Sequence, residues 1–560
     1  MAKVVFKNQP GLTPELFPQD IFSKIPQDHP CRLVSSVVDQ LDLSEIIKKY
    51  KGGGTSSYHP RMMIKVLFYS YLSNVYSCRK IAKALQENIS FMFISGNSTP
   101  DFRTINDFRG KVLKDHIHQL FGEVVKLLVE LGYVSLDIQY IDGTKIEATS
   151  NRYTFVWKGS VEKYKDKLEK KVTSILSGIE SSIQSDSQEL NKEELPKKID
   201  TEALRERLSQ INKKLKKPNK QQAKQIEKLQ EEHLPKLEKY ELDLKVMGKR
   251  KSYSKTDPDA TFMRMKEDHM KNGQLKPAYN AQISTENQFI THTSVHQTPG
   301  DTTTLSPHLQ GFEDSLGKQS KKVVADAGYG SEENYEMLEG QQIEAFVKYN
   351  YFHKEQKRKT KNNPFLRQNL FYNSELDFFV CPMGQIMRKV TTSKRTSSNG
   401  YESEVTRYQA IRCKGCPLRS LCHRSTTDRV IEVSHRLEEL KSKARKLLTS
   451  EEGIKHRSNR PAEVEAVFGQ LKSNNRFNRF TMRGLTKVSL ELSLMAIGHN
   501  LRKIVAQKLK EKENNTKKYL QIHKKQSVTT LIERLDQIMT TTQIILMQVN
   551  QMNQLLKLSL

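Results

Sequence analysis

The 560-residue sequence has few cysteines, no long apolar run and no excess of acidic residues. Six cysteines are too few for the disulfide framework of a secreted protein. The longest apolar stretches, such as residues 62–72, are interrupted by Lys65 and are too short to cross a bilayer. The first residues also lack the apolar core of a secretory signal. We therefore expect a soluble, cytoplasmic protein with no membrane partner.

Basic residues are abundant instead. Lysine and arginine number 92 against 64 acidic residues, which gives a net charge of +28. A surplus of this size favours a polyanionic partner, with nucleic acid as the first candidate and ribosome-type binding included. The alternative is a protein that is simply basic and soluble. The length allows roughly two to four domains, each able to bury its own core.

The first part of the chain, residues 1–130, has helical patterns throughout. A capped helix starts after Asp101 and carries Arg103 and Arg109 on its surface. This helical domain either binds DNA or serves as a scaffold without a helix that reads a DNA groove. The sequence leaves both possibilities open.

Short strands and helices alternate in residues 131–350. Residues 276–284 and 288–295 have the alternation of two paired strands, and further strands and helices follow them. This succession predicts an α/β catalytic core with a mixed sheet. Residues of about 160–250 interrupt it with Lys, Glu, Leu and Ile at helical spacing, which predicts a solvated, coiled helical insertion.

The remainder of the chain divides into three segments. Residues 351–450 contain Lys-rich loops and four of the cysteines. Residues 451–510 return to helical patterns and complete the predicted core. Residues 511–560 form a tail that is polar at first and then amphipathic. The tail is either a helix for self-association or a weakly packed terminus.

Three carboxylates are distinguished by their positions. Asp142 ends one apolar run and Asp326 ends another, whereas Glu465 lies within a helical pattern. Two Mg²⁺ ions about 4 Å apart, held by acidic oxygens, can cleave and rejoin a phosphodiester. Three carboxylates suffice because magnesium keeps several waters. Asp142 would bridge both ions, and the other two acids would hold one each. The structural alternative is that such aspartates form turns or cap helices.

A helical-wheel argument favours Glu465 over the neighbouring Glu463. The apolar stripe of this helix consists of Val464, Val467, Phe468 and Leu471. At about 100° per residue, Glu465 shares one flank of the stripe with Lys472 and Arg476. Glu463 lies on the other flank, away from these cations. A carboxylate that holds metal beside cations that receive phosphate makes chemical sense, so Glu465 is the candidate.

Four cysteines form a separate cluster, with Cys413 and Cys416 three residues apart and Cys381 and Cys422 on either side of them. In a reducing cytoplasm this spacing favours a structural Zn²⁺ site in a small, zinc-ribbon-like insertion. His423 could replace Cys381 or Cys422 as a ligand. Free thiols and redox chemistry are the alternatives.

The three acids lie within motifs that resemble those of bacterial insertion-sequence DDE transposases: Tyr-Ile-Asp-Gly-Thr at Asp142, Ala-Asp-Ala-Gly-Tyr-Gly at Asp326 and Val-Glu-Ala-Val-Phe-Gly-Gln-Leu-Lys ending at Lys472. The Glu-x6-Lys spacing is similar to the signature of their RNase H-like branch. The Asn-x-x-Phe-x-Arg-Phe-x-x-Arg-Gly pattern over residues 474–484 resembles the continuation of that signature. The resemblance covers roughly residues 15–505.

One departure from this pattern concerns the residues that precede the glutamate. Ser458 and Pro461 stand where this branch often has a tyrosine and an arginine. Arg457 and Arg460 are nearby, and either could substitute for the missing arginine.

The resemblance implies an RNase H-like core that uses two Mg²⁺ or Mn²⁺ ions. Water would nick the end of a DNA element, and the released 3′-hydroxyl would attack target DNA. Lys472 would neutralise the phosphate or the leaving oxygen. The arginines expected to contact the DNA backbone are Arg457, Arg460, Arg476, Arg479 and Arg483. Members of such a family usually act on double-stranded DNA as homo-oligomers, which implies association with the nucleoid.

The leading hypothesis is therefore a DNA transposase. A nuclease of the same fold without strand transfer is the first alternative. A domesticated, non-catalytic DNA-binding protein is the second.

Overall fold

The computed structural model describes residues 20–50, 57–186, 199–214, 220–265, 273–397 and 399–514, together with positions 517, 540, 542, 543 and 547. The predicted tail over residues 511–560 lies almost entirely outside the described residues. No helix in the described part of the chain is both long enough and apolar enough to span a membrane.

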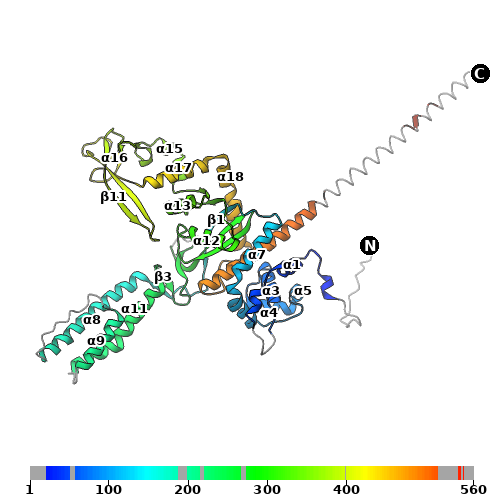
Figure 1. Ribbon diagram of the computed structural model, residues 1–560, viewed down its shortest axis with the longest axis horizontal. Helices are drawn as coiled ribbons and strands as arrows, with labels where there is room; N and C mark the ends of the chain where they lie inside the picture. Colours follow the sequence, from blue (N-terminus) through cyan, green and yellow to red (C-terminus); the bar gives the residue numbers. More distant parts are fainter. Residues whose placement is uncertain are drawn as a thin grey trace, which may run out of the picture.

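The described N-terminal residues are helical, as the sequence predicts (Figure 1). The α-helices are α1 (Pro30–Gln40), α2 (Ser44–Lys48), α3 (Pro60–Leu72), α4 (Cys78–Glu87), α5 (Ile89–Ser95), α6 (Phe102–Asp107) and α7 (Ile117–Glu130). Short turns η1 (Ile21–Lys24), η2 (Phe108–Val112) and η3 (Leu113–Asp115) accompany them. α3 begins with Pro60 at its first position, where a missing N–H costs nothing, and its remaining apolar side chains are nearly all buried.

A mixed six-stranded sheet forms the centre of the molecule, which confirms the prediction of an α/β domain with mixed pairing. Its strands are β1 (Ile138–Glu147), β4 (Thr261–Arg264), β5 (Leu275–Glu286), β6 (Phe289–His296), β7 (Lys322–Ala325) and β8 (Glu344–Val347). β1 pairs antiparallel with β5 and parallel with β7, and β7 pairs parallel with β8. β6 returns antiparallel along β5 through a two-residue turn.

Two groups of helices pack against this sheet. α12 (Leu305–Leu316) packs against β6, and α13 (Glu332–Gly340) packs against β8. α17 (His435–Thr449) packs against β8, and a long helix over residues 485–514 contributes further buried apolar side chains to the core. Between the last two lies a continuous helical rod composed of α18 (Glu451–Arg460), the π-helical turn η6 (Pro461–Glu465), α19 (Ala466–Gly469) and the π-helical turn η7 (Gln470–Asn474). η6 lies against β1 and β5.

The helical insertion is a bundle with its own apolar core. It consists of α8 (Lys158–Asp186), α9 (Thr201–Lys214), α10 (Lys220–Lys228), η4 (Leu229–His233) and α11 (Leu234–Met247). The short antiparallel strands β2 (Phe155–Trp157) and β3 (Ser252–Ser254) connect it to the central sheet region. Figure 1 shows the bundle extending away from the sheet.

Residues 371–433 form a second, antiparallel sheet where we expected Lys-rich loops. Its strands are β9 (Phe371–Asn373), β10 (Phe378–Val380), β11 (Ile386–Thr396), β12 (Glu402–Ala410) and β13 (Val430–Val433). Short helical pieces surround it: α14 (Phe352–Glu355), α15 (Arg358–Lys361), η5 (Arg367–Asn369) and α16 (Arg419–Cys422). The expectation was wrong because most side chains of β11 are exposed, so no apolar alternation marks the strand.

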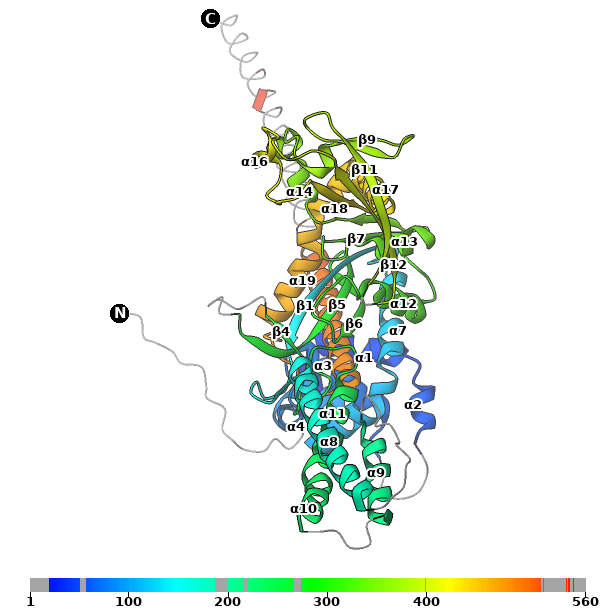
Figure 2. The same cartoon turned by 90° about the vertical axis from the view of Figure 1, so that its left-hand side faces the viewer.

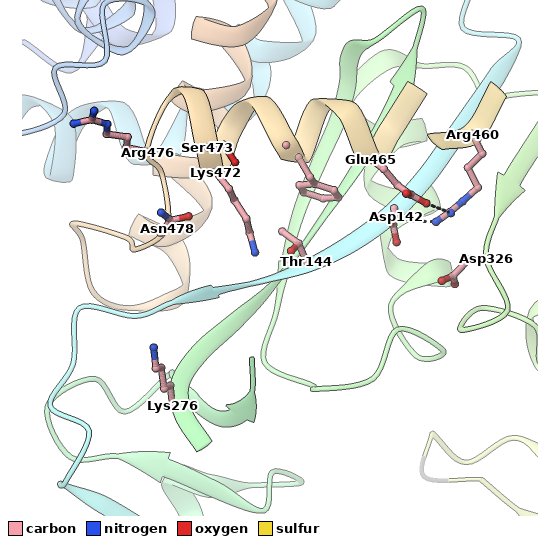
Figure 3. Close-up of a pocket in the computed structure, with 12 residues that line it drawn as sticks. Asp142, Thr144, Lys276, Asp326, Arg460, Glu465, Lys472, Ser473, Arg476 and Asn478 are labelled. Carbon is pink, nitrogen blue, oxygen red and sulfur yellow. Dashed lines mark hydrogen bonds and ion pairs between the residues drawn. The ribbon is translucent and has the colours of Figure 1, made fainter. Parts of the chain in front are cut away.

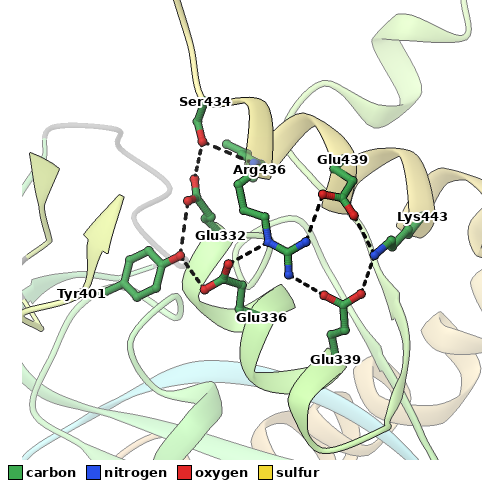
Figure 4. Close-up of polar contacts among 9 residues, drawn as sticks. Glu332, Glu336, Glu339, Tyr401, Ser434, Arg436, Glu439 and Lys443 are labelled. Carbon is green, nitrogen blue, oxygen red and sulfur yellow. Dashed lines mark hydrogen bonds and ion pairs between the residues drawn. The ribbon is translucent and has the colours of Figure 1, made fainter. Parts of the chain in front are cut away.

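A polar network attaches the second sheet to the core (Figure 4). Tyr401 on the β11–β12 hairpin donates a hydrogen bond to Glu336 on α13 at 2.8 Å. Arg436 on α17 bonds Glu336 at 2.8 Å and Glu339 at 2.6 Å. In Figure 2 the second sheet and the helical insertion lie at opposite ends of the molecule, with the central sheet between them.

Candidate functional site

The three predicted acids line one cleft with a volume of about 890 Å³ (Figure 3). Asp142 comes from β1, Asp326 follows the end of β7, and Glu465 ends η6. The cleft is also lined by Thr144, Lys276, Arg460, Phe468, Gly469, Lys472, Ser473, Arg476 and Asn478. Residues separated by more than 300 positions in the chain therefore meet at a single surface.

Strand pairing brings the two aspartates together. Tyr140 on β1 pairs with Val324 on β7, and each aspartate lies two residues beyond its member of that pair. Asp142 is buried and accepts a hydrogen bond from the N–H of Gly143 at 2.8 Å. Asp326 is partly exposed and accepts one from the N–H of Gly328 at 2.8 Å. These local bonds orient the carboxylates but leave oxygens that face the cleft.

A buried amide network supports β1 from behind. A Cβ on Gly143 would lie 2.2 Å from Nε2 of Gln282 and 2.8 Å from Oδ1 of Asp301, so a larger residue here would displace these side chains. Gln282 donates to Asp301 at 3.0 Å and accepts from the hydroxyl of Tyr329. Burial raises the pKa of Tyr329 well above its ordinary value, so its hydroxyl remains a donor. Sequence reasoning missed Gln282 and Asp301 as site residues, because the pairing of β1 with β5 places Gln282 opposite Gly143 and a hydrogen bond from Gln282 then holds Asp301 beside it.

Arg460 joins two of the acids. Its guanidinium lies 3.1 Å from Asp142 Oδ2 and 2.8 Å from Glu465 Oε1. The Arg460 side chain is only 7% exposed, whereas that of Glu465 is 52% exposed. A buried guanidinium thus bridges a buried and an exposed carboxylate at the centre of the cleft.

The π-helical turn explains how Arg460 reaches Glu465. In a regular α-helix, residues five apart lie about 140° apart around the axis. Between Pro461 and Glu465 the backbone widens into a π-turn, closed by the bond from the N–H of Ala466 to the carbonyl of Pro461. The wider turn brings Arg460 and Glu465 to the same side of the rod. Arg460, rather than Arg457, therefore supplies the guanidinium beside the glutamate.

Glu463 takes a different position from Glu465. Its carboxylate accepts a hydrogen bond from the N–H of Gln288 at 2.7 Å, in the turn between β5 and β6. Burial raises the pKa of Glu463. Glu463 is thus part of the packing of the rod against the sheet.

Several cations face the cleft. Lys472 lies beside β1 and donates to the carbonyl oxygen of Lys145 at 3.2 Å, and Arg476 is exposed at the end of the rod. Lys276 on β5 also lines the cleft. Lys348, next to β8, has its pKa lowered by burial and by Arg460 and Arg457 nearby. Sequence reasoning missed Lys276 and Lys348 because neither lies in an acidic motif.

The other predicted arginines have partners within the protein. Arg479 donates to the carbonyl oxygens of Ala148 and Ser150 at 3.1 Å each, and Arg483 donates to that of Thr149 at 2.7 Å. Both therefore clamp the segment that follows β1, although their side chains remain partly accessible. Arg457 lies over the ring of Phe352. Contact of these arginines with DNA stays a prediction.

The four cysteines and His423 line one small cavity in the second sheet. Arg429 lies in its wall: its guanidinium is 3.0 Å from Cys422 Sγ, and its backbone N–H donates to Cys413 Sγ at 3.3 Å. Within the described residues, no group of three or more His, Cys, Asp or Glu side chains is placed to hold a metal ion. The predicted zinc site is therefore not supported by this arrangement of the cysteines and His423.

The three carboxylates of the cleft are likewise not gathered into a metal-binding group in this arrangement. Their chemistry nevertheless suits a hard divalent cation, since they are oxygen donors that share one cleft. Arg460, which bridges two of them, occupies the space where such a cation would be bound.

Two family models match the chain. A model described as "Transposase DDE domain" matches residues 380–505, which include Glu465 and Lys472. A model described as "Transposase domain (DUF772)" matches residues 19–111, within the N-terminal helices. No match was found among curated proteins or among solved structures. Neither family match covers Asp142 or Asp326, so the place of these two residues in the cleft is a finding of the structure alone.

Proposed function

We propose that the chain is an insertion-sequence DDE transposase that cleaves DNA at the ends of its element and joins those ends to target DNA, a proposal that the two family matches support. The convergence of Asp142, Asp326 and Glu465 on one cleft carries this proposal. The three acids come from a strand, from the end of a neighbouring strand and from a helical turn, and one of them, Asp142, is buried.

The order of the strands supports an RNase H-like core. β5 runs antiparallel to both of its neighbours, β1 and β6, and β7 and β8 run parallel to β1. One aspartate is on the central strand, the other follows the strand beside it, and the glutamate is on a helix that crosses the sheet. This arrangement offers three acidic side chains to a phosphodiester that lies in the cleft.

Mg²⁺ or Mn²⁺ would be held by Asp142, Asp326 and Glu465. Such ions activate the attacking oxygen and stabilise the leaving one. The side chains of the protein would do the rest. Lys472 would neutralise charge on the phosphate or the leaving oxygen, while Lys276 and Arg476 would bind the DNA backbone without reading bases.

The test is an assay with Mg²⁺, a DNA fragment that carries the sequences flanking the gene, and a target plasmid. We expect the fragment ends to be nicked and then joined to the plasmid. Cleavage without joining would identify a nuclease, and binding without either would identify a non-catalytic DNA-binding protein. Size analysis of the complex with paired ends would test the proposed homo-oligomer.

A further inference from the structure

Arg460 is placed to link metal binding to DNA binding. We propose that its guanidinium acts as the counter-ion of Asp142 and Glu465 in the free protein and transfers to a DNA phosphate when DNA enters the cleft. Divalent cations and DNA would then bind cooperatively through this one side chain. The inference rests on the proposed function, because it assumes that the acids hold metal.

The contacts of Arg460 favour an exchange over a permanent bridge. Two of its guanidinium nitrogens contact carboxylates, while its Nε is buried and has no hydrogen-bond partner. A cation that enters between Asp142 and Glu465 must displace the guanidinium from both. The displaced side chain is nearly buried, and a buried charge without a partner is costly. Metal binding alone therefore leaves Arg460 in an unfavourable state.

The surroundings of Arg460 are strongly basic. Arg460 and Arg457 both lower the pKa of Lys348, so each of these arginines lies close to that lysine. Lys276 and Lys472 line the same cleft. Repulsion from these cations opposes any move of the freed guanidinium toward them. A DNA phosphate would give the displaced guanidinium a new anionic partner, because guanidinium binds two phosphate oxygens through two parallel hydrogen bonds.

The consequence is a coupling free energy that must be equal in both directions. DNA strengthens metal binding by giving Arg460 a new anion, and metal strengthens DNA binding by releasing Arg460 from the acids. In the absence of DNA the site has low affinity for metal, which restrains cleavage until a substrate is in place.

The experiment compares the full-length protein with Arg460→Gln and Arg457→Gln. Both variants lose one positive charge from α18, but Arg457 stacks on the ring of Phe352, whereas Arg460 contacts the two acids. Isothermal titration with Mn²⁺ gives the metal affinity without DNA. Fluorescence anisotropy with a labelled duplex of arbitrary sequence, with and without Mn²⁺, gives the coupling. Circular dichroism checks the fold, and Arg460→Lys serves as a second variant that keeps the charge.

In the wild-type protein we expect Mn²⁺ to strengthen duplex binding roughly tenfold. Arg460→Gln should bind Mn²⁺ more tightly than Arg457→Gln when no DNA is present, and its duplex affinity should respond little to Mn²⁺. Arg460→Lys should keep part of the coupling, since an ammonium pairs with a phosphate but cannot bridge two carboxylates in the same way. Equal metal affinities for the two glutamine variants, or full coupling in Arg460→Gln, would overturn the inference.

Failure of the proposed function would look different. If Asp142→Asn and Glu465→Gln bound Mn²⁺ as tightly as the wild type, the acids would not be metal ligands, and both proposals would fall. If those variants lose Mn²⁺ binding while Arg460→Gln behaves like Arg457→Gln, only the role of Arg460 is removed.

Discussion

Two arginines of this protein each lie at the centre of a group of carboxylates, yet the two groups differ in burial and in balance of charge. Arg460 bridges Asp142 and Glu465 in the cleft with a side chain that is 7% exposed (Figure 3). Arg436 contacts Glu336, Glu339 and Glu439 between α13 and α17 with a side chain that is 39% exposed (Figure 4).

The comparison shows that a cluster of carboxylates does not by itself indicate a catalytic site. Around Arg436 the acids are paired: Lys443 bonds both Glu339 and Glu439, and Arg436 and Tyr401 lower the pKa of Glu336 through hydrogen bonds. These groups keep their contact with water and hold two helices together. In the cleft, Asp142 is buried within β1 and shares the guanidinium of Arg460 with the exposed Glu465, so one nearly buried cation bridges two acids of unequal burial.

The largest difference between the two groups should appear in catalysis. Asp142→Asn, Asp326→Asn or Glu465→Gln should lower cleavage and joining by about a thousandfold or more, since each removes a proposed metal ligand. Glu336→Gln removes the same charge from the exposed group and should change the rate by less than about twofold. Rates come from the end-joining assay, and duplex affinity from anisotropy. Full activity in any one of the three cleft variants would exclude that residue from the mechanism.

The next comparison is between two lysines, Lys472 in the cleft and Lys443 in the exposed group, and their effects on the cleavage rate. Lys472→Met should slow cleavage by about a hundredfold because it removes a charge aimed at the phosphate, and it should leave duplex binding within a fewfold of the wild type. Lys443→Met, in the exposed group, should leave the rate unchanged. A Lys472 variant that loses binding and rate together would indicate that this lysine only holds DNA.

The packing beside Asp142 can be tested by adding a methyl group at Gly143. Gly143→Ala places a Cβ 2.2 Å from Gln282 Nε2, so Gln282 or β1 must move. We expect a loss of about 1–3 kcal/mol of stability, as for overpacking in a core, together with slower cleavage. Gly469→Ala is the matched control, since a Cβ there meets no atom within 4 Å. Thermal unfolding gives the stability of both variants, and the end-joining assay gives their cleavage rates. Equal Tm values for the two variants would contradict the predicted clash.

Much of the fold could be predicted from residue patterns, and the geometry of the cleft could not. The alternation around residues 276–295 predicts the pairing of β5 with β6, and the helical patterns of the first 130 residues predict the N-terminal helices. The second sheet was missed because β11 is exposed along most of its length. Pairing of its backbone with β12 holds that strand, and backbone hydrogen bonds leave no mark in a hydropathy pattern.

The cleft depends on features that a helical wheel does not contain. Spacing alone could nominate Asp142, Asp326 and Glu465, but their approach requires the parallel pairing of β1 with β7 and the packing of η6 across β1. The position of Arg460 requires the π-turn between Pro461 and Glu465, whereas a wheel assumes a constant turn per residue. The sequence alone therefore does not decide whether Arg457 or Arg460 lies beside the glutamate.

The exposed group itself should give the smallest effect. Arg436→Met removes three ion pairs, but all of them are open to water, where such pairs contribute little. We expect Tm to fall by less than about 2 °C, and the fall to shrink at high salt, because exposed charges are then already screened. Cleavage should be unaffected, since α13 and α17 keep their apolar packing. Arg460→Met offers the contrast, because it leaves Asp142 buried beside Glu465 without their shared cation. A larger fall in Tm for Arg436→Met than for Arg460→Met would show that burial does not determine how much each bridging arginine contributes to stability.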